Sequence, residues 1–90
     1  MNTTTHRLCE ELYDIFLATN KWEIDMDGDI LYIDVKTSDS SIKMELINAL
    51  RGTQILHVDH AGNHIHIETR YRHTPELFHC LWKREEERLL

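Results

Sequence analysis

Two segments of the chain alternate apolar and polar side chains around a glycine, and this pattern constrains the fold more than any other feature. Alternation with a period of two is typical of a strand with one buried face. A glycine between two such runs indicates a tight hairpin, because glycine accepts the positive φ that a type I′ turn needs. We therefore predict β-hairpins in residues 21–36 and 53–72, with turns at Asp27-Gly28 and Ala61-Gly62.

The first hairpin divides into an apolar face and an acidic face. Its expected turn pairs Met26 with Asp29, and alternation then fixes the side of every other residue. The face expected in the core carries Trp22, Ile24, Met26, Leu31, Ile33 and Val35. The face expected toward solvent carries Glu23, Asp25, Ile30, Tyr32, Asp34 and Lys36.

The second hairpin divides in the same way, with histidines in place of most of the acids. Its expected turn pairs His60 with Asn63, so that His57 lies opposite His66 and Asp59 opposite His64. The aliphatic face expected in the core carries Leu56, Val58, Ile65 and Ile67. The face expected toward solvent carries His57, Asp59, His64, His66 and Glu68, and its acids should raise the pKa of the histidines.

Helical periodicity flanks and separates the two hairpins. Apolar residues recur at three- and four-residue spacing from about Thr5 to Asn20, from Ile42 to a stop at Gly52, and after Thr74-Pro75. The third helix should bury Leu77, Phe78, Leu81, Trp82 and Leu89. The order is α-β-β-α-β-β-α, which predicts an α+β fold: a four-stranded antiparallel sheet with helices packed on one face, in a single domain of residues 1–90.

The cysteines do not suggest a disulfide framework. Cys9 and Cys80 are the two cysteines of the chain, they are far apart in the sequence, and neither belongs to a Cys-x-x-Cys pair. Each borders an apolar helix stripe. We expect both to be half-buried thiols that act as small hydrophobic side chains.

Charge and hydropathy exclude several classes of partner. The formal charge is −6, and residues 1–50 hold ten acids against four bases. Such a chain is not expected to bind nucleic acid directly or an anionic membrane surface, because both require a positive excess. The longest apolar runs are too short to span a membrane, and the first six residues are too polar for a signal peptide. We expect a cytoplasmic protein.

No catalytic motif occurs in the sequence. It lacks a phosphate-binding glycine loop, a Gly-x-Ser-x-Gly elbow and a His-Glu-x-x-His motif, so we expect no enzymatic activity, no catalytic residues and no cofactor. The alternative is a transition-metal site. His57, His64 and His66 share one hairpin face at spacings from which three imidazoles could converge on one zinc ion.

The pattern favours a small acidic interaction protein of the inhibitor or adaptor type, such as phages and mobile elements encode. Its partner would be a basic or neutral protein, for example a nucleic-acid-binding enzyme whose phosphate site attracts acids. The predicted contact residues are an aliphatic–aromatic pair and the acids around it, namely Ile30, Tyr32, Glu23, Asp25 and Asp34. The alternatives are the metal-binding module and a structural homodimer.

Overall fold

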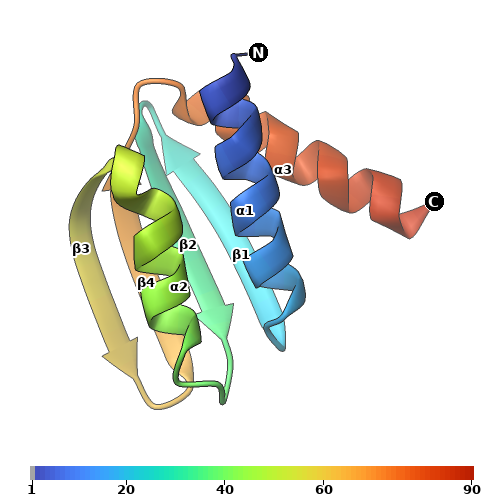
Figure 1. The fold of residues 1–90 in the computed structure, drawn as a ribbon. Coiled ribbons are helices and arrows are strands. Elements are labelled where there is room, and N and C mark those ends of the chain that lie inside the picture. The colour runs from blue at the N-terminus through green and yellow to red at the C-terminus, as the bar shows by residue number, and fades with distance from the viewer. Residues whose placement is uncertain (1) are drawn as a thin grey trace.

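A computed structural model describes residues 2–90 of the chain. Within these residues the order of elements is the one that the sequence predicts, α-β-β-α-β-β-α (Figure 1). The elements are α1 (Thr3–Leu17), β1 (Lys21–Asp27), β2 (Ile30–Lys36), α2 (Ile42–Ala49), the 3₁₀ turn η1 (Leu50–Gly52), β3 (Gln54–Ala61), β4 (His64–Arg70) and α3 (Thr74–Leu89).

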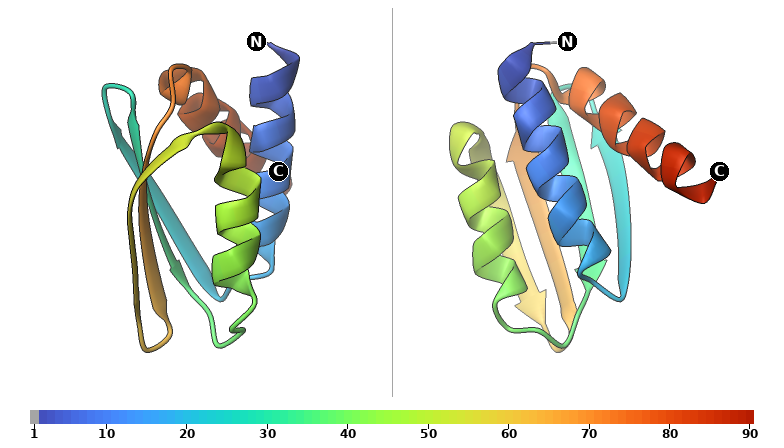
Figure 2. Two further views of the ribbon diagram at one scale, coloured as in Figure 1. Left: turned by 60° about the vertical axis from the view of Figure 1, so that its left-hand side comes forward. Right: turned by 45° about the vertical axis from the view of Figure 1, so that its right-hand side comes forward.

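The strands form one antiparallel sheet in the order β1-β2-β4-β3. The two hairpins therefore join through their second strands, and β1 and β3 are the edges. The helices pack on one face of this sheet, with α1 and α2 side by side (Figure 2). The other face is covered by no helix of residues 2–90. The predicted α+β fold is thus confirmed.

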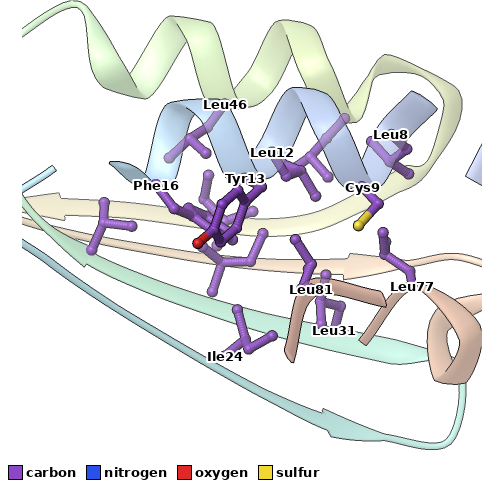
Figure 3. Packing of buried hydrophobic residues seen from close by; sticks show 14 of the residues in the cluster. Leu8, Cys9, Leu12, Tyr13, Phe16, Ile24, Leu31, Leu46, Leu77 and Leu81 are labelled. Atoms are coloured by element: carbon purple, nitrogen blue, oxygen red, sulfur yellow. The ribbon is translucent and has the colours of Figure 1, made fainter. Parts of the chain in front are cut away.

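The core lies between the sheet and the helices (Figure 3). Along α1 the buried positions follow the three- and four-residue spacing that the sequence shows, so the helix presents one apolar side to the sheet. Each fully buried aliphatic or aromatic side chain contributes about 1.5–3 kcal/mol relative to exposure. The core residues labelled in Figure 3 are Leu8, Cys9, Leu12, Tyr13, Phe16, Ile24, Leu31, Leu46, Leu77 and Leu81.

Both hairpin turns lie one residue further along the chain than the sequence predicts. Asp27 pairs with Ile30, and Ala61 pairs with His64. The residue at the first turn position is therefore glycine, Gly28 or Gly62, each with φ 61°. Type II′ turns place glycine there, whereas the expected type I′ turns would force Asp27 and Ala61 into positive φ. The shift moves each pairing by two residues, so each side chain stays on its predicted face. The prediction that Met26 is buried is wrong: it is 36% exposed, because it lies near the end of the edge strand β1.

A β-bulge interrupts the edge strand β3. Ile55 pairs with Thr69 and His57 pairs with Glu68, so Leu56 is the extra residue. The prediction that Leu56 is a core residue is wrong: it is 40% exposed, and Ile55 packs against the core in its place. The other aliphatic residues predicted for this face are partly buried, Val58, or fully buried, Ile65 and Ile67.

The last helix, α3, runs past the β1 edge, and its C-terminal half extends beyond the sheet (Figures 1 and 2). Leu77 and Leu81 are buried as predicted. Trp82 and Leu89, also predicted as core, are 42% and 70% exposed. The correction follows from the position of the helix, because Trp82 lies at the edge of the sheet, with its ring 5.9 Å from that of Trp22 in β1, and α3 continues beyond the sheet from there.

Cys9 and Cys80 form a disulfide that joins α1 to α3. The prediction of two free thiols is therefore wrong. The two residues are 71 positions apart in the sequence, but α1 packs against α3, and their Cα atoms are 6.4 Å apart. That separation lies within the range that disulfides span. Sequence distance carried no information about this contact.

Candidate interaction surface

The uncovered face of the sheet collects the polar faces of both hairpins into one surface, which we call the open face. Antiparallel pairing aligns its side chains in rows that cross β1, β2, β4 and β3 in that order. One central row is Glu23, Asp34, His66 and Asp59. The next is Asp25, Tyr32, Glu68 and His57.

The structure brings together the residues predicted to bind a partner. Glu23 and Asp25 are exposed on β1, and the other three, Ile30, Tyr32 and Asp34, are half-buried on the central strand β2. Tyr32 lies between Asp25 of β1 and Glu68 of β4. An aromatic side chain flanked by carboxylates on both neighbouring strands is the centre of this surface.

His66 contacts a carboxylate through each of its ring nitrogens. Its Nδ1 lies 2.8 Å from Oδ1 of Asp34, and its Nε2 lies 2.7 Å from Oε2 of Glu68. An ionised carboxylate only accepts hydrogen bonds, and neutral imidazole has a single N–H. Both hydrogen bonds therefore form only when His66 is the imidazolium cation. The hydrogen bond to Glu68, with a further contribution from Asp34, raises the pKa of His66 above its usual value.

Asp34 joins two histidines across the boundary between the hairpins. The Oδ1 atom that contacts His66 also lies 3.0 Å from Nε2 of His64. Asp34 belongs to the first hairpin and both histidines belong to the second. The acidic surface and the histidine surface that the sequence predicts separately are thus one connected network.

The histidine pairs are not the predicted ones. His57 lies opposite Glu68 instead of His66, and Asp59 lies opposite His66 instead of His64. These corrections follow from the shifted turn. In the part of the chain that the structure describes, no three potential ligands are arranged to hold a metal ion. Both nitrogens of His66 already contact carboxylates, so the zinc site of His57, His64 and His66 stays a prediction without geometric support.

Sequence reasoning left Glu68 and His66 out of the partner surface. They join it because β4 pairs with β2, and the pattern within each hairpin says nothing of how the hairpins pair. No helix within residues 2–90 has the length and apolarity to cross a membrane. No protein-family model and no curated protein matches the sequence.

Proposed function

We propose that this chain is a non-catalytic interaction module, of the inhibitor or adaptor type, that binds a basic protein partner through its open face. The observation that carries the proposal is the concentration of acids around one half-buried tyrosine on a face that no helix of the described residues covers. The outward-facing acids are Glu23, Asp25, Asp27, Asp34, Asp59 and Glu68, against the bases Lys21, Lys36 and Arg70.

Six acids against three bases, with His66 as a fourth cation in its imidazolium form, leave this face with a net negative charge. Lys21 lies 3.3 Å from Glu23, and Arg70 lies 3.5 Å from Asp29. Both ion pairs are largely exposed, and exposed pairs stabilise a protein by about 0–1 kcal/mol. A basic partner can displace them at small cost. The remaining acids accelerate its approach, because complementary charge acts mainly on the association rate.

Tyr32 is expected to supply most of the binding energy, because the acids act mainly on the association rate. It is half-buried on a central strand, and Ile30 lies two residues away on the same face. Tyrosine is enriched among residues that dominate binding energy, since it offers a large rigid area and a hydroxyl. A nucleic-acid-binding enzyme is one suitable partner, because its phosphate site attracts carboxylates.

The test compares changes at the face with the same change elsewhere. Partners are captured by cross-linking in the cells that encode the chain, and binding of the captured protein is then measured with purified variants. Tyr32→Ala should speed dissociation about 30-fold, the equivalent of about 2 kcal/mol. Glu23→Lys with Asp25→Lys should slow association and make it less sensitive to salt.

The matched control is Glu86→Lys with Glu87→Lys, which makes the same charge change on exposed positions of α3. It should leave the association rate close to that of the unchanged protein. If the α3 variant slows binding as much as the β1 variant, the effect is one of net charge and the open face is not the interface.

The cytoplasmic location is also a proposal, and the disulfide provides its test. Cytoplasmic proteins keep their thiols reduced, whereas disulfides persist in oxidising compartments. Trapping thiols with an alkylating reagent in intact cells should find Cys9 and Cys80 reduced if the protein is cytoplasmic. A fully oxidised pair in cells would place the protein in an oxidising compartment.

A further inference from the structure

The edge strand β1 is long and regular. All seven of its residues pair with β2 in an unbroken register from Lys21 to Asp27. The opposite edge, β3, is interrupted by its bulge between Ile55 and His57. Bulges, prolines, short length and charged side chains prevent an edge strand from pairing with another chain. Of these devices β1 has only its charges, and three of the four are acidic: Glu23, Asp25 and Asp27.

The backbone of β1 alternates between paired and unpaired groups. Asp27 and Ile30 flank a two-residue turn, and such a pair exchanges two backbone hydrogen bonds. In an antiparallel pair these hydrogen-bonded positions recur at every second residue, so Asp25 and Glu23 also pair through their backbones with β2. The N–H and C=O groups of Trp22, Ile24 and Met26 therefore point away from β2. The N–H of Met26 is satisfied by Oδ1 of its neighbour Asp25 at 2.8 Å, as expected for an amide that has no strand beside it.

The two sides of this edge have opposite chemistry. On the open face, Glu23, Asp25 and Asp27 are exposed in a row along the strand. On the helix side, Met26 is 36% exposed, and Trp82 of α3 is 42% exposed. The rings of Trp22 and Trp82 are 5.9 Å apart, so the apolar side of the edge continues from β1 onto α3.

We propose that β1 binds an extended segment of the basic partner as an added strand, in which lysine or arginine alternates with apolar residues. The basic side chains of such a segment face Glu23, Asp25 and Asp27, and its apolar side chains pack on Met26 and Trp82. Its backbone pairs with the outward groups of Trp22, Ile24 and Met26. The proposal rests on the proposed function and specifies how the partner binds.

Charge disfavours a second copy of this chain as the added strand. In an antiparallel pair of β1 strands centred on Ile24, Glu23 of each copy faces Asp25 of the other. In a pair centred on Asp25, the two copies of Asp25 face each other, and Glu23 of each copy faces Asp27 of the other. Like charges directly opposite one another destabilise a sheet. The edge therefore selects for a strand with bases at these positions.

Three capped heptapeptides provide the probe. The first is Lys-Val-Lys-Val-Lys-Val-Lys, the second has the same residues in the order Lys-Lys-Val-Lys-Val-Val-Lys, and the third is the first with N-methyl groups on its valines. Binding is followed by tryptophan fluorescence and by hydrogen exchange of the β1 amides. We expect the alternating peptide to bind about tenfold more tightly than the other two, and to protect the amides of Trp22 and Ile24.

Met26→Pro tests the edge from the side of the protein. It removes an outward N–H without removing a hydrogen bond to β2, and edge strands tolerate proline at such positions. His60→Pro is the matched control, because the backbone N–H of His60 points away from β4 at the other edge of the sheet, as that of Met26 points away from β2. Met26→Pro should weaken binding of the alternating peptide about tenfold, and His60→Pro should leave it unchanged.

The outcomes separate this inference from the proposed function. Equal binding of the alternating and reordered peptides, or equal effects of the two proline variants, would overturn strand addition while leaving an acidic face that binds basic chains. If none of the peptides binds even at low salt, both proposals are wrong. A circular dichroism spectrum of each proline variant shows that the sheet is intact.

Discussion

At the scale of single residues, His66 couples proton binding to the structure of the sheet. Its two hydrogen bonds require the imidazolium form, and its pKa is raised in the folded protein by Glu68 and Asp34. A group whose folded pKa exceeds its unfolded pKa stabilises the fold fully below the unfolded value, near 6.5 for histidine. This contribution is lost as the pH rises through the folded pKa.

We therefore predict that His66→Gln lowers the free energy of unfolding by about 1 kcal/mol at pH 6, and by much less at pH 8.5. His57→Gln is the control, because His57 is exposed on the same face and its side chain makes no hydrogen bond to the described residues. Urea unfolding of both variants across this pH range measures the difference. Parallel pH profiles for the two variants would show that the His66 contacts do not form in solution.

The turn glycines provide a second prediction at this scale. An added Cβ meets open space at Gly28, Gly62 and Gly52 alike, but the first two have φ +61°. Alanine at Gly28 or Gly62 should thus destabilise the protein by about 1–2 kcal/mol through backbone strain alone. Gly52→Ala should be close to neutral. Thermal unfolding of the three variants tests the order, and a Gly52 variant as unstable as the others would contradict it.

At the scale of elements, the alternation of side chains predicts faces reliably and register poorly. A shift of two residues in pairing leaves every side chain on its face, so Tyr32 and His57 could be assigned to the open face without knowledge of the turn. The position of the turn decides which residues are opposite, and the sequence pattern does not distinguish Asp27-Gly28 from Gly28-Asp29. The bulge at Leu56 has no signal in the alternation at all.

The strand order has a weaker signal in the sequence. The inward side of β3 includes His60, which pairs with the fully buried Ile65 and is itself exposed. A polar residue at an inward position indicates an edge strand. The inward positions of β4 are Ile65, Ile67 and Thr69, all fully buried, as a central strand requires. The comparison indicates that β4, and not β3, pairs with the first hairpin. The structure shows this pairing, with His66 of β4 opposite Asp34 of β2.

The disulfide between α1 and α3 leads to a prediction about the elements that it joins. In the chain-entropy account, a loop of this length stabilises the folded protein by about 4 kcal/mol, because the crosslink restricts the unfolded chain. Reduction with dithiothreitol should lower the urea midpoint of the natural protein. The variant with Cys9→Ala and Cys80→Ala should be insensitive to the reductant.

The amount of thiol released provides the independent check. If the Cys9–Cys80 disulfide forms, protein that is denatured without a reductant should contain no thiol that reacts with a thiol reagent. Two reactive thiols, together with a midpoint that dithiothreitol does not change, would contradict the pairing of Cys9 with Cys80.

At the scale of the whole molecule, the charge predicts which polymers the protein avoids. The net charge is −6, and the one basic cluster that the sequence suggests is three arginines, Arg51, Arg70 and Arg72, of which Arg51 donates to Asn48 and Arg70 pairs with Asp29. A strongly salt-dependent nucleic-acid binder neutralises about six to ten phosphates, far more than these side chains can supply. We expect no retardation of DNA or RNA at about 150 mM salt in a mobility-shift gel. Sub-micromolar binding would show that a local basic site overrides the net charge.

The bond between Cys9 and Cys80 also closes residues 9–80 into a covalent ring. The whole sheet lies inside the ring, since β1 begins at Lys21 and β4 ends at Arg70. One proteolytic cut in the ring, for example trypsin cleavage after the exposed Arg51, opens it without releasing a fragment. Such a nicked molecule should run as one species on a denaturing gel and separate into two only after a reductant is added. The two pieces of such a cleaved chain would stay joined, with the sheet still tethered at both ends.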